Sequence, residues 1–112
     1  MKTSLWMLFV IFLVFIFVSA GPSENKGAPD ISIGAESKGQ VAFPHKTHQD
    51  TLKECDTCHS LFPKEPNSIQ KLIGEGKLQK KQVMNHCRDC HKEKTAAGEK
   101  AGPTSCATCH PK

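Results

Sequence analysis

The motif Cys-Xaa-Xaa-Cys-His occurs three times in this chain of 112 residues, at Cys55–His59, Cys87–His91 and Cys106–His110. The motifs contain all six cysteines and three of the six histidines. A haem c group needs two thiols for its thioether bonds, an adjacent histidine for one face of the iron and a ligand for the other face. The remaining histidines, which number one per motif, are His45, His48 and His86. The sequence therefore predicts three covalently attached haem c groups, each with two histidine ligands.

Each motif assigns the same roles to its residues. We expect the thioether bonds to form at three cysteine pairs: Cys55 and Cys58, Cys87 and Cys90, and Cys106 and Cys109. We expect the adjacent histidines to bind the irons from one side: His59, His91 and His110. An iron with two histidine ligands has no free position for a substrate, so this coordination favours electron transfer over catalysis. The sequence offers no nucleophile–base pair and no paired carboxylates, and we expect no catalytic residues.

Two other kinds of site use the same residue types. Six cysteines in a short exported chain are compatible with a disulfide framework, and paired Cys-Xaa-Xaa-Cys units are compatible with zinc. Neither alternative explains why a histidine follows every second cysteine. Neither explains why the remaining histidines match the motifs in number. The pattern therefore favours haem.

The ligands opposite the motif histidines follow from spacing. His45 and His48 are three residues apart after Pro44, so on a helix they are neighbours on one surface. Two rings placed in this way cannot approach one iron from opposite sides, so each should bind a different haem. His86 directly precedes Cys87 and is therefore better placed for an iron other than that of its own motif. Met84 is the alternative ligand, but His86 completes the count, and we expect Met84 to pack against a porphyrin.

The N-terminal segment has the features of an export signal. An uncharged apolar run from Leu5 to Val18 is followed by Ser19, Ala20 and Gly21, which predicts a signal peptide over residues 1–20, cleaved after Ala20. The expected location is the periplasm. The alternative is that residues 5–20 are retained as an anchor in the inner membrane. Residues 21–29 are expected to form a flexible leader, and residues 30–112 the trihaem domain.

After residue 20 the chain has thirteen large apolar side chains, and none of them follows Met84. Such a segment cannot bury enough apolar area to offset its ordering entropy, so the haems must supply the core. We expect a small haem-cored domain, mainly helical with little regular structure. Alternating apolar residues predict a hairpin over 31–43, and helical patterns cover 45–54, 68–73 and 77–86. Residues 92–103 read as a loop, and Thr104 is expected to cap a final turn.

The charge of the chain limits its partners. The formal net charge is +4, and loss of Lys2 with the signal peptide leaves +3. Three oxidised haems, each with two propionates and one positive ferric centre, add about −3 and bring the protein close to neutral. The basic residues form neither a single run nor a pattern interleaved with aromatic residues, so we expect no nucleic acid partner. The expected partners are periplasmic or membrane-associated redox proteins. The protein itself is expected to be a monomer.

With Val41-Ala-Phe-Pro-His45-Lys-Thr-His48 and the three motifs, the chain resembles the class III multihaem cytochromes. It is most similar to the trihaem cytochrome c7 group, a relative of tetrahaem cytochrome c3. The resemblance covers about Asp30 to Lys112. It implies a hairpin and a few short helices wrapped around three closely spaced haems, and a role in anaerobic respiration. It also implies three axial pairs: His45 with His59, His48 with His91, and His86 with His110.

The expected function is therefore that of a low-potential electron carrier working by outer-sphere transfer through three haems with two histidines each. We expect no enzymatic activity. The alternative is an electron-transfer subunit of a respiratory or reductase complex, held at the membrane by a retained N-terminal segment.

Overall fold

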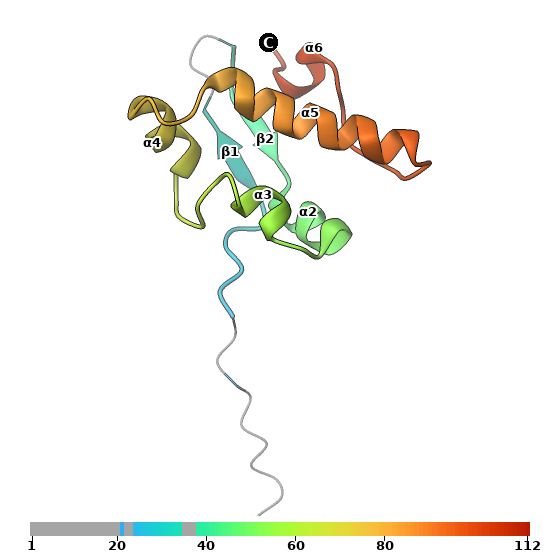
Figure 1. Ribbon diagram of the computed structural model, residues 1–112, viewed down its shortest axis with the longest axis horizontal. Coiled ribbons are helices and arrows are strands. Elements are labelled where there is room, and N and C mark those ends of the chain that lie inside the picture. Colours follow the sequence, from blue (N-terminus) through green and yellow to red (C-terminus); the bar gives the residue numbers. More distant parts are fainter. Residues whose placement is uncertain (1–20, 22–23, 35–37) are drawn as a thin grey trace, which may run out of the picture.

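The computed structural model describes residues 21, 24–34 and 38–112 (Figure 1). The predicted signal peptide and the alternative anchor lie outside these residues, as do residues 35–37 of the predicted hairpin. None of the helices in the described part of the chain is long and apolar enough to cross a membrane. In Figure 1, the helices α2 and α3 lie at one end of a short hairpin, and α4, α5 and α6 lie towards its other end.

The predicted hairpin is confirmed. Strands β1 (Ile31–Ile33) and β2 (Val41–Phe43) pair antiparallel, with Ile31 opposite Phe43 and Ile33 opposite Val41. Because side chains alternate along a strand, this register puts the four apolar residues on one face of the hairpin. The hairpin therefore presents an apolar surface immediately before the first candidate ligand, His45.

Helix α2 (His45–Leu52) follows Pro44 directly and carries both His45 and His48. The sequence predicted one helix over 45–54, and the end of that prediction is wrong. Lys53 adopts a left-handed conformation (φ 62°), and its N–H donates to the carbonyl of Gln49. This closes the helix, and the first motif forms the separate short helix α3 (Asp56–His59). The break redirects the chain so that the motif does not continue along the axis of α2.

Helix α4 (Ser68–Gly74) matches the predicted turns over 68–73. Helix α5 (Lys80–Ala96) corrects two predictions, because it begins three residues later than expected and runs through the second motif into the predicted loop. Its start is defined by the N–H of Gln79, which donates to the side chain of Gln82 at 2.7 Å. No glycine or proline interrupts the helix before Gly98, which has a positive φ of 79° and suits the chain reversal after it.

Helix α6 (Cys106–Cys109) carries the third motif. Ser105, and not Thr104 as the sequence predicted, occupies the position before its first residue. The Ser105 and Thr108 hydroxyls are 2.6 Å apart and hydrogen-bond to each other. The helix is a single turn, so the neighbouring segments must hold it in place.

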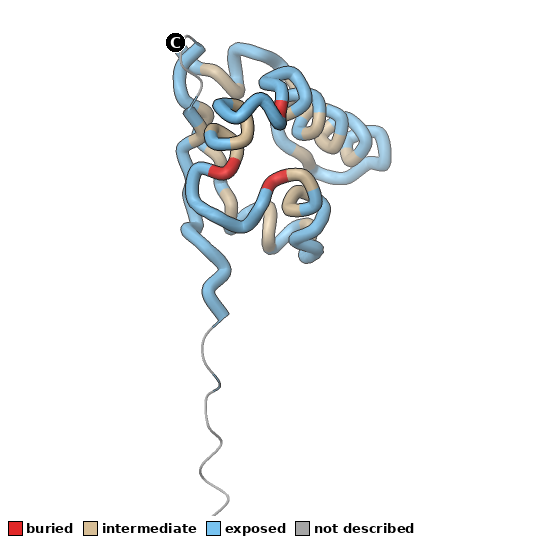
Figure 2. The backbone as a smooth tube through the Cα atoms, turned by 60° about the vertical axis from the view of Figure 1, so that its left-hand side comes forward, coloured by how far each residue is buried: buried red, intermediate tan, exposed pale blue. Residues whose placement is uncertain are grey.

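The polypeptide has almost no core of its own. Among the described residues, the buried apolar side chains are Phe62 and Leu78, which are 7% and 4% exposed, and Ser68 is also buried. All three lie in the segment of residues 62–78, between the first motif and α5 (Figure 2). Neither α5 nor α6 contains a buried residue. Two buried apolar side chains do not offset the ordering entropy of a domain of this size, which agrees with a core made by cofactors.

We therefore expect the chain to lack a cooperative fold when haem is not attached. Expression without the haem-attachment machinery should yield a chain with little helical circular dichroism and no thermal transition. The same residues with haem attached should unfold cooperatively. Dispersed amide resonances and a cooperative transition in the haem-free chain would contradict this expectation.

Candidate metal centre

His45, on α2, and His59, at the end of α3, form the first pair of candidate ligands. Their ring centroids are 6.1 Å apart, with an angle of 78° between the ring planes. Two imidazoles that bind one metal ion from opposite sides, with bonds of about 2 Å, have ring centres about 6 Å apart. The separation of this pair therefore fits a shared metal ion.

His48 and His91 form a second pair of the same kind. Their ring centroids are also 6.1 Å apart, and the planes are inclined by 32°. His45 and His48 thus face different partners, although both lie on α2 within one helical turn. This arrangement fits the expectation that the two histidines serve different irons, and it puts the two candidate centres next to each other.

Backbone carbonyl groups orient most of the candidate ligands through Nδ1. Four histidines have Nδ1 within 2.9 Å of a carbonyl oxygen: His45 with Ala28, His48 with Pro44, His59 with Phe62, and His91 with Pro103. His110 makes a longer contact of 3.4 Å with the carbonyl of Gly39. With the proton on Nδ1, each ring donates to the carbonyl and leaves Nε2 as the available ligand atom. This donor set fits haem iron.

His86 is arranged differently from the other histidines. Its Nε2, and not Nδ1, lies 2.9 Å from a backbone carbonyl, that of Thr57 in the first motif. Its ring packs edge-on against Phe62, with the centroids 5.5 Å apart and an interplanar angle of 84°. Among the described residues, the ring contacts of His86 do not include His110. The structure thus brings together the first two pairs implied by the resemblance, but not the third.

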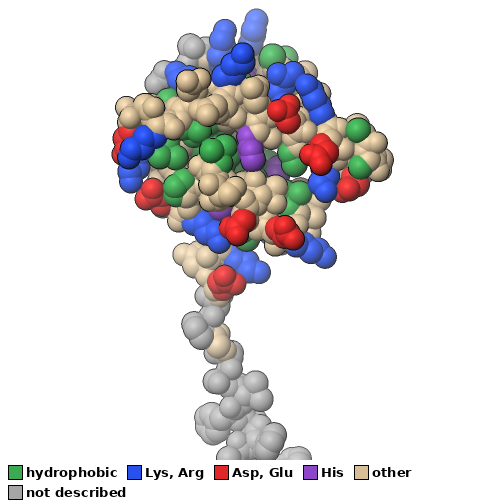
Figure 3. Space-filling model, in the orientation of Figure 1, with side chains coloured by type: hydrophobic (Ala, Val, Ile, Leu, Met, Phe, Trp, Pro, Cys, Tyr) green, Lys and Arg blue, Asp and Glu red, His purple; other side chains and the backbone are tan. Residues whose placement is uncertain are grey.

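Histidine side chains lie between apolar side chains on the face shown in Figure 3. Gly102 lies close to one candidate ligand, because a Cβ on this residue would lie 2.6 Å from Cε1 of His91. Real Cβ atoms do not approach other heavy atoms so closely, so this position requires glycine while His91 keeps its place. Sequence reasoning treated Gly102 only as a loop residue. The signal that could have pointed to it is its position next to Pro103, whose carbonyl binds the same ring.

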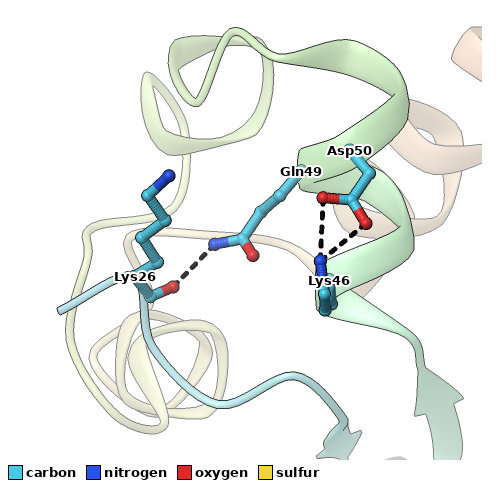
Figure 4. Close-up of polar contacts among 4 residues, drawn as sticks. All are labelled: Lys26, Lys46, Gln49 and Asp50. Carbon is cyan, nitrogen blue, oxygen red and sulfur yellow. Dashed lines mark hydrogen bonds and ion pairs between the residues drawn. The ribbon is translucent and has the colours of Figure 1, made fainter. Parts of the chain in front are cut away.

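A second support that the sequence did not reveal comes from residues 26–29, which we call the N-terminal strap. The carbonyl of Ala28 accepts from His45, and the carbonyl of Pro29 accepts from the N–H of Lys46 at 2.9 Å. The side-chain amide of Gln49 donates to the carbonyl of Lys26 at 2.6 Å, next to an ion pair of 2.8 Å between Lys46 and Asp50 (Figure 4). The strap lies within the predicted leader, and it is bound to α2 along one side.

The six cysteines are free thiols. Burial, together with the charges of Cys58, Cys109 and Cys90, raises the pKa of Cys87 to about 11. Burial and the charge of Cys90 also raise the pKa of Cys58. Such thiols stay protonated at neutral pH and are not activated nucleophiles. The influence of Cys58 and Cys109 on Cys87 shows that the three motifs converge.

The alternatives to haem find no support in this arrangement. Within the described residues, no three side chains of histidine, cysteine, aspartate or glutamate come together as a metal-binding group. The cysteines, all of which lie in that part of the chain, form no disulfide. The fold instead brings imidazole rings together in pairs. Each pair lies next to the two thiols of one motif.

The model of the family described as cytochrome c7 and related cytochrome c matches residues 41–111. Cytochrome c7 of Geobacter metallireducens is 39% identical over 74 residues, which are 66% of this chain and 67% of that protein. Cytochrome c3 of Desulfuromonas acetoxidans is 34% identical over 81 residues, which are 72% of this chain and 96% of that protein. The resemblance predicted from the motifs is thereby confirmed.

Comparison with solved structures leads to the same family. The solution structure of the trihaem cytochrome PpcA from Geobacter sulfurreducens has a TM-score of 0.53 and 32% identity, and the match covers 76% of this chain and 100% of that one. PpcE, a cytochrome c7 from the same organism, has a TM-score of 0.53 and 28% identity with the same coverage. The small hairpin and the short helices match the fold of these neighbours. The chain belongs to the cytochrome c7 family of multihaem electron-transfer proteins.

Proposed function

We propose that this protein is a periplasmic electron carrier of low potential that exchanges electrons with redox partner proteins by outer-sphere transfer. This proposal rests on two pairs of histidines, His45 with His59 and His48 with His91. In each pair the ring centres are 6.1 Å apart. We further infer that the carrier works as a monomer and that its partners are periplasmic or membrane-associated proteins.

The residues that hold the haems are also inferred. Each cysteine pair of a motif forms the thioether bonds of one haem, and His59, His91 and His110 each bind one face of an iron. His45 and His48 bind the opposite faces of the first two irons. The ligand count predicts His86 for the opposite face of the third iron, and the resemblance pairs it with His110.

A haem iron held by two protein ligands supplies one-electron chemistry without a binding site for substrate. The chain tunes this chemistry through its imidazoles. A ring that donates Nδ1–H to a carbonyl is more basic at Nε2. A more basic ligand stabilises the more positive oxidation state of a metal, which lowers its reduction potential. The carbonyls of Ala28, Pro44, Phe62 and Pro103 are therefore expected to keep the first two centres low in potential.

The test of this coordination is removal of one ligand. His45→Ala should leave one haem with a single histidine, so that the reduced protein binds about one carbon monoxide molecule and one of its three potentials rises. Carbon monoxide titration and a redox titration measure both effects. Thr47→Ala is the matched control, because Thr47 is an exposed residue of the same helix. No gain of carbon monoxide binding in His45→Ala would contradict the proposal.

The approach of Gly102 to His91 generates a second prediction. Gly102→Ala should push the His91 ring out of position, because the new Cβ would lie 2.6 Å from the ring. We expect an altered electron paramagnetic resonance signal of one haem and a shift in one potential, with all three haems still attached. Gly74→Ala is the control, since a Cβ there meets nothing within 4 Å. Identical spectra for the two variants would show that Gly102 does not position the ligand.

The proposed location is tested at the N-terminus. If residues 1–20 are removed during export, the protein purified from the periplasm should begin at Gly21. Mass spectrometry of the intact holoprotein measures this directly. A chain that begins at Met1 and sediments with the membrane would instead support the alternative of a membrane-anchored electron-transfer subunit.

A further inference from the structure

The N-terminal strap, residues 26–29, provides the hydrogen-bond acceptor for one candidate ligand. The carbonyl oxygen of Ala28 lies 2.9 Å from Nδ1 of His45, although the two residues are 17 positions apart in the sequence. His59, the other candidate ligand of the first centre, has its acceptor at Phe62, only 3 positions away. The orientation of His59 is therefore local to its motif, whereas that of His45 depends on where the strap lies.

Two further bonds from α2 hold the strap on either side of Ala28. The side-chain amide of Gln49 donates to the carbonyl of Lys26 at 2.6 Å, and Figure 4 shows this amide turned towards the strap. The N–H of Lys46 donates to the carbonyl of Pro29 at 2.9 Å. This N–H is one of the donors that the first turn of a helix leaves without an internal acceptor. The Ala28 carbonyl is thus held between two anchored carbonyls.

The side chains of the strap contribute little to this attachment. Residues 26–29 are all exposed, so hydrogen bonds rather than apolar burial keep the segment on α2. The bonds that do so come from His45, Lys46 and Gln49. Because they are few, the loss of one removes a large share of the attachment.

Gly27 shapes the strap where it passes His45. Its φ of 79° lies in the left-handed region, which glycine adopts without the strain that a Cβ causes. Its N–H donates to Oδ1 of Asn25 at 3.0 Å, which supports the turn at this point. A Cβ on Gly27 would lie 3.3 Å from Cε1 of His45 and 3.6 Å from Nδ1. The position therefore combines a backbone conformation that favours glycine with a close approach to the ligand ring.

We propose that the strap is a positioning element of the first haem, in which Gly27 and Gln49 keep the Ala28 carbonyl on His45 and so lower the potential of that haem. This inference rests on the proposed coordination of the first iron by His45 and His59. The family model begins at residue 41, so the strap lies outside the part of the chain that it matches. The segment before the hairpin is thus part of the redox site and not only a connection to the signal peptide.

The direction of the effect follows from the hydrogen bond. A ring that donates Nδ1–H to the Ala28 carbonyl is more basic at Nε2 and stabilises ferric iron. When the strap leaves α2, this fixed acceptor is lost and His45 becomes a weaker ligand. The potential of the first haem should then rise. The acceptors of the second centre, Pro44 and Pro103, lie outside the strap, so its potential should stay unchanged.

Gly27→Ala tests the proposal against a matched control. The new Cβ displaces the strap or the ring, so a redox titration followed by the haem methyl resonances should show a higher potential for the first haem alone. Gly98→Ala makes the same change at the same φ of 79°, where a Cβ meets nothing within 4 Å. It reproduces the backbone strain and should leave all three potentials unchanged. Equal shifts in the two variants would overturn the proposal, as would the absence of a shift in Gly27→Ala.

Gln49→Leu tests the same strap from the side of α2. It removes the donor to the Lys26 carbonyl without changing the charge of the chain, and it should raise the same potential. Because both substitutions act through one strap, the double variant with Gly27→Ala should shift the potential by less than the sum of the single shifts. Thr47→Ala, at an exposed position of the same helix, should cause no shift. Additive shifts in the double variant would contradict a common mechanism.

Carbon monoxide binding separates this inference from the function on which it rests. If reduced His45→Ala gains no carbon monoxide binding, the proposed coordination fails, and the role of the strap fails with it. If His45→Ala does gain it, while Gly27→Ala and Gln49→Leu have three haems and wild-type potentials, only the role of the strap is refuted. Intact mass gives the number of haems in each variant. Should Gly27→Ala carry fewer than three, the potential of Gln49→Leu decides.

Discussion

The rest of the structure depends on the hydrogen bonds from histidine Nδ1 to backbone carbonyls. Three of the acceptors belong to segments far from the rings in sequence, namely Ala28 for His45, Pro103 for His91 and Gly39 for His110. Each of these bonds fixes an irregular segment of the chain to a candidate histidine ligand. Because the described residues bury only two apolar side chains, such segments have little else to hold them. The same bonds that orient the imidazoles therefore also define the path of the chain.

Helix α2 makes the arrangement of the centres compact. It carries His45 and His48 three residues apart, and these rings face partners from the first and second motifs. Two centres that share one short helix lie close together, which favours rapid exchange of electrons between them. Helix α5 connects the other elements, since His86 contacts the first motif and Arg88 the approach to the third. The positions of the three haem c groups relative to one another thus depend on two helices.

The elements that sequence patterns predicted well are those with a clear periodicity. The alternation at Ile31, Ile33, Val41 and Phe43 led to the correct hairpin, and the turns of α4 were also expected. The C-terminal half of α5 was missed because its polar residues resemble a loop, although no helix breaker precedes Gly98. The end of α2 was missed because Lys53 adopts a left-handed conformation, which is uncommon for lysine and is not indicated by the sequence. The N-terminal strap was missed because it acts through carbonyl oxygens, which every residue has.

The sequence by itself determined the kind of cofactor and its number, and it predicts the points of attachment. These follow from covalent chemistry between contiguous residues, and no tertiary contact is needed to recognise Cys-Xaa-Xaa-Cys-His. Only the tertiary structure decided which rings face each other. The ligand count predicts His86 for the third iron, whereas in the structure its Nε2 lies next to the carbonyl of Thr57 and its ring packs on Phe62. The physical reason is that axial coordination joins residues from separate segments, so it depends on the positions of those segments in space.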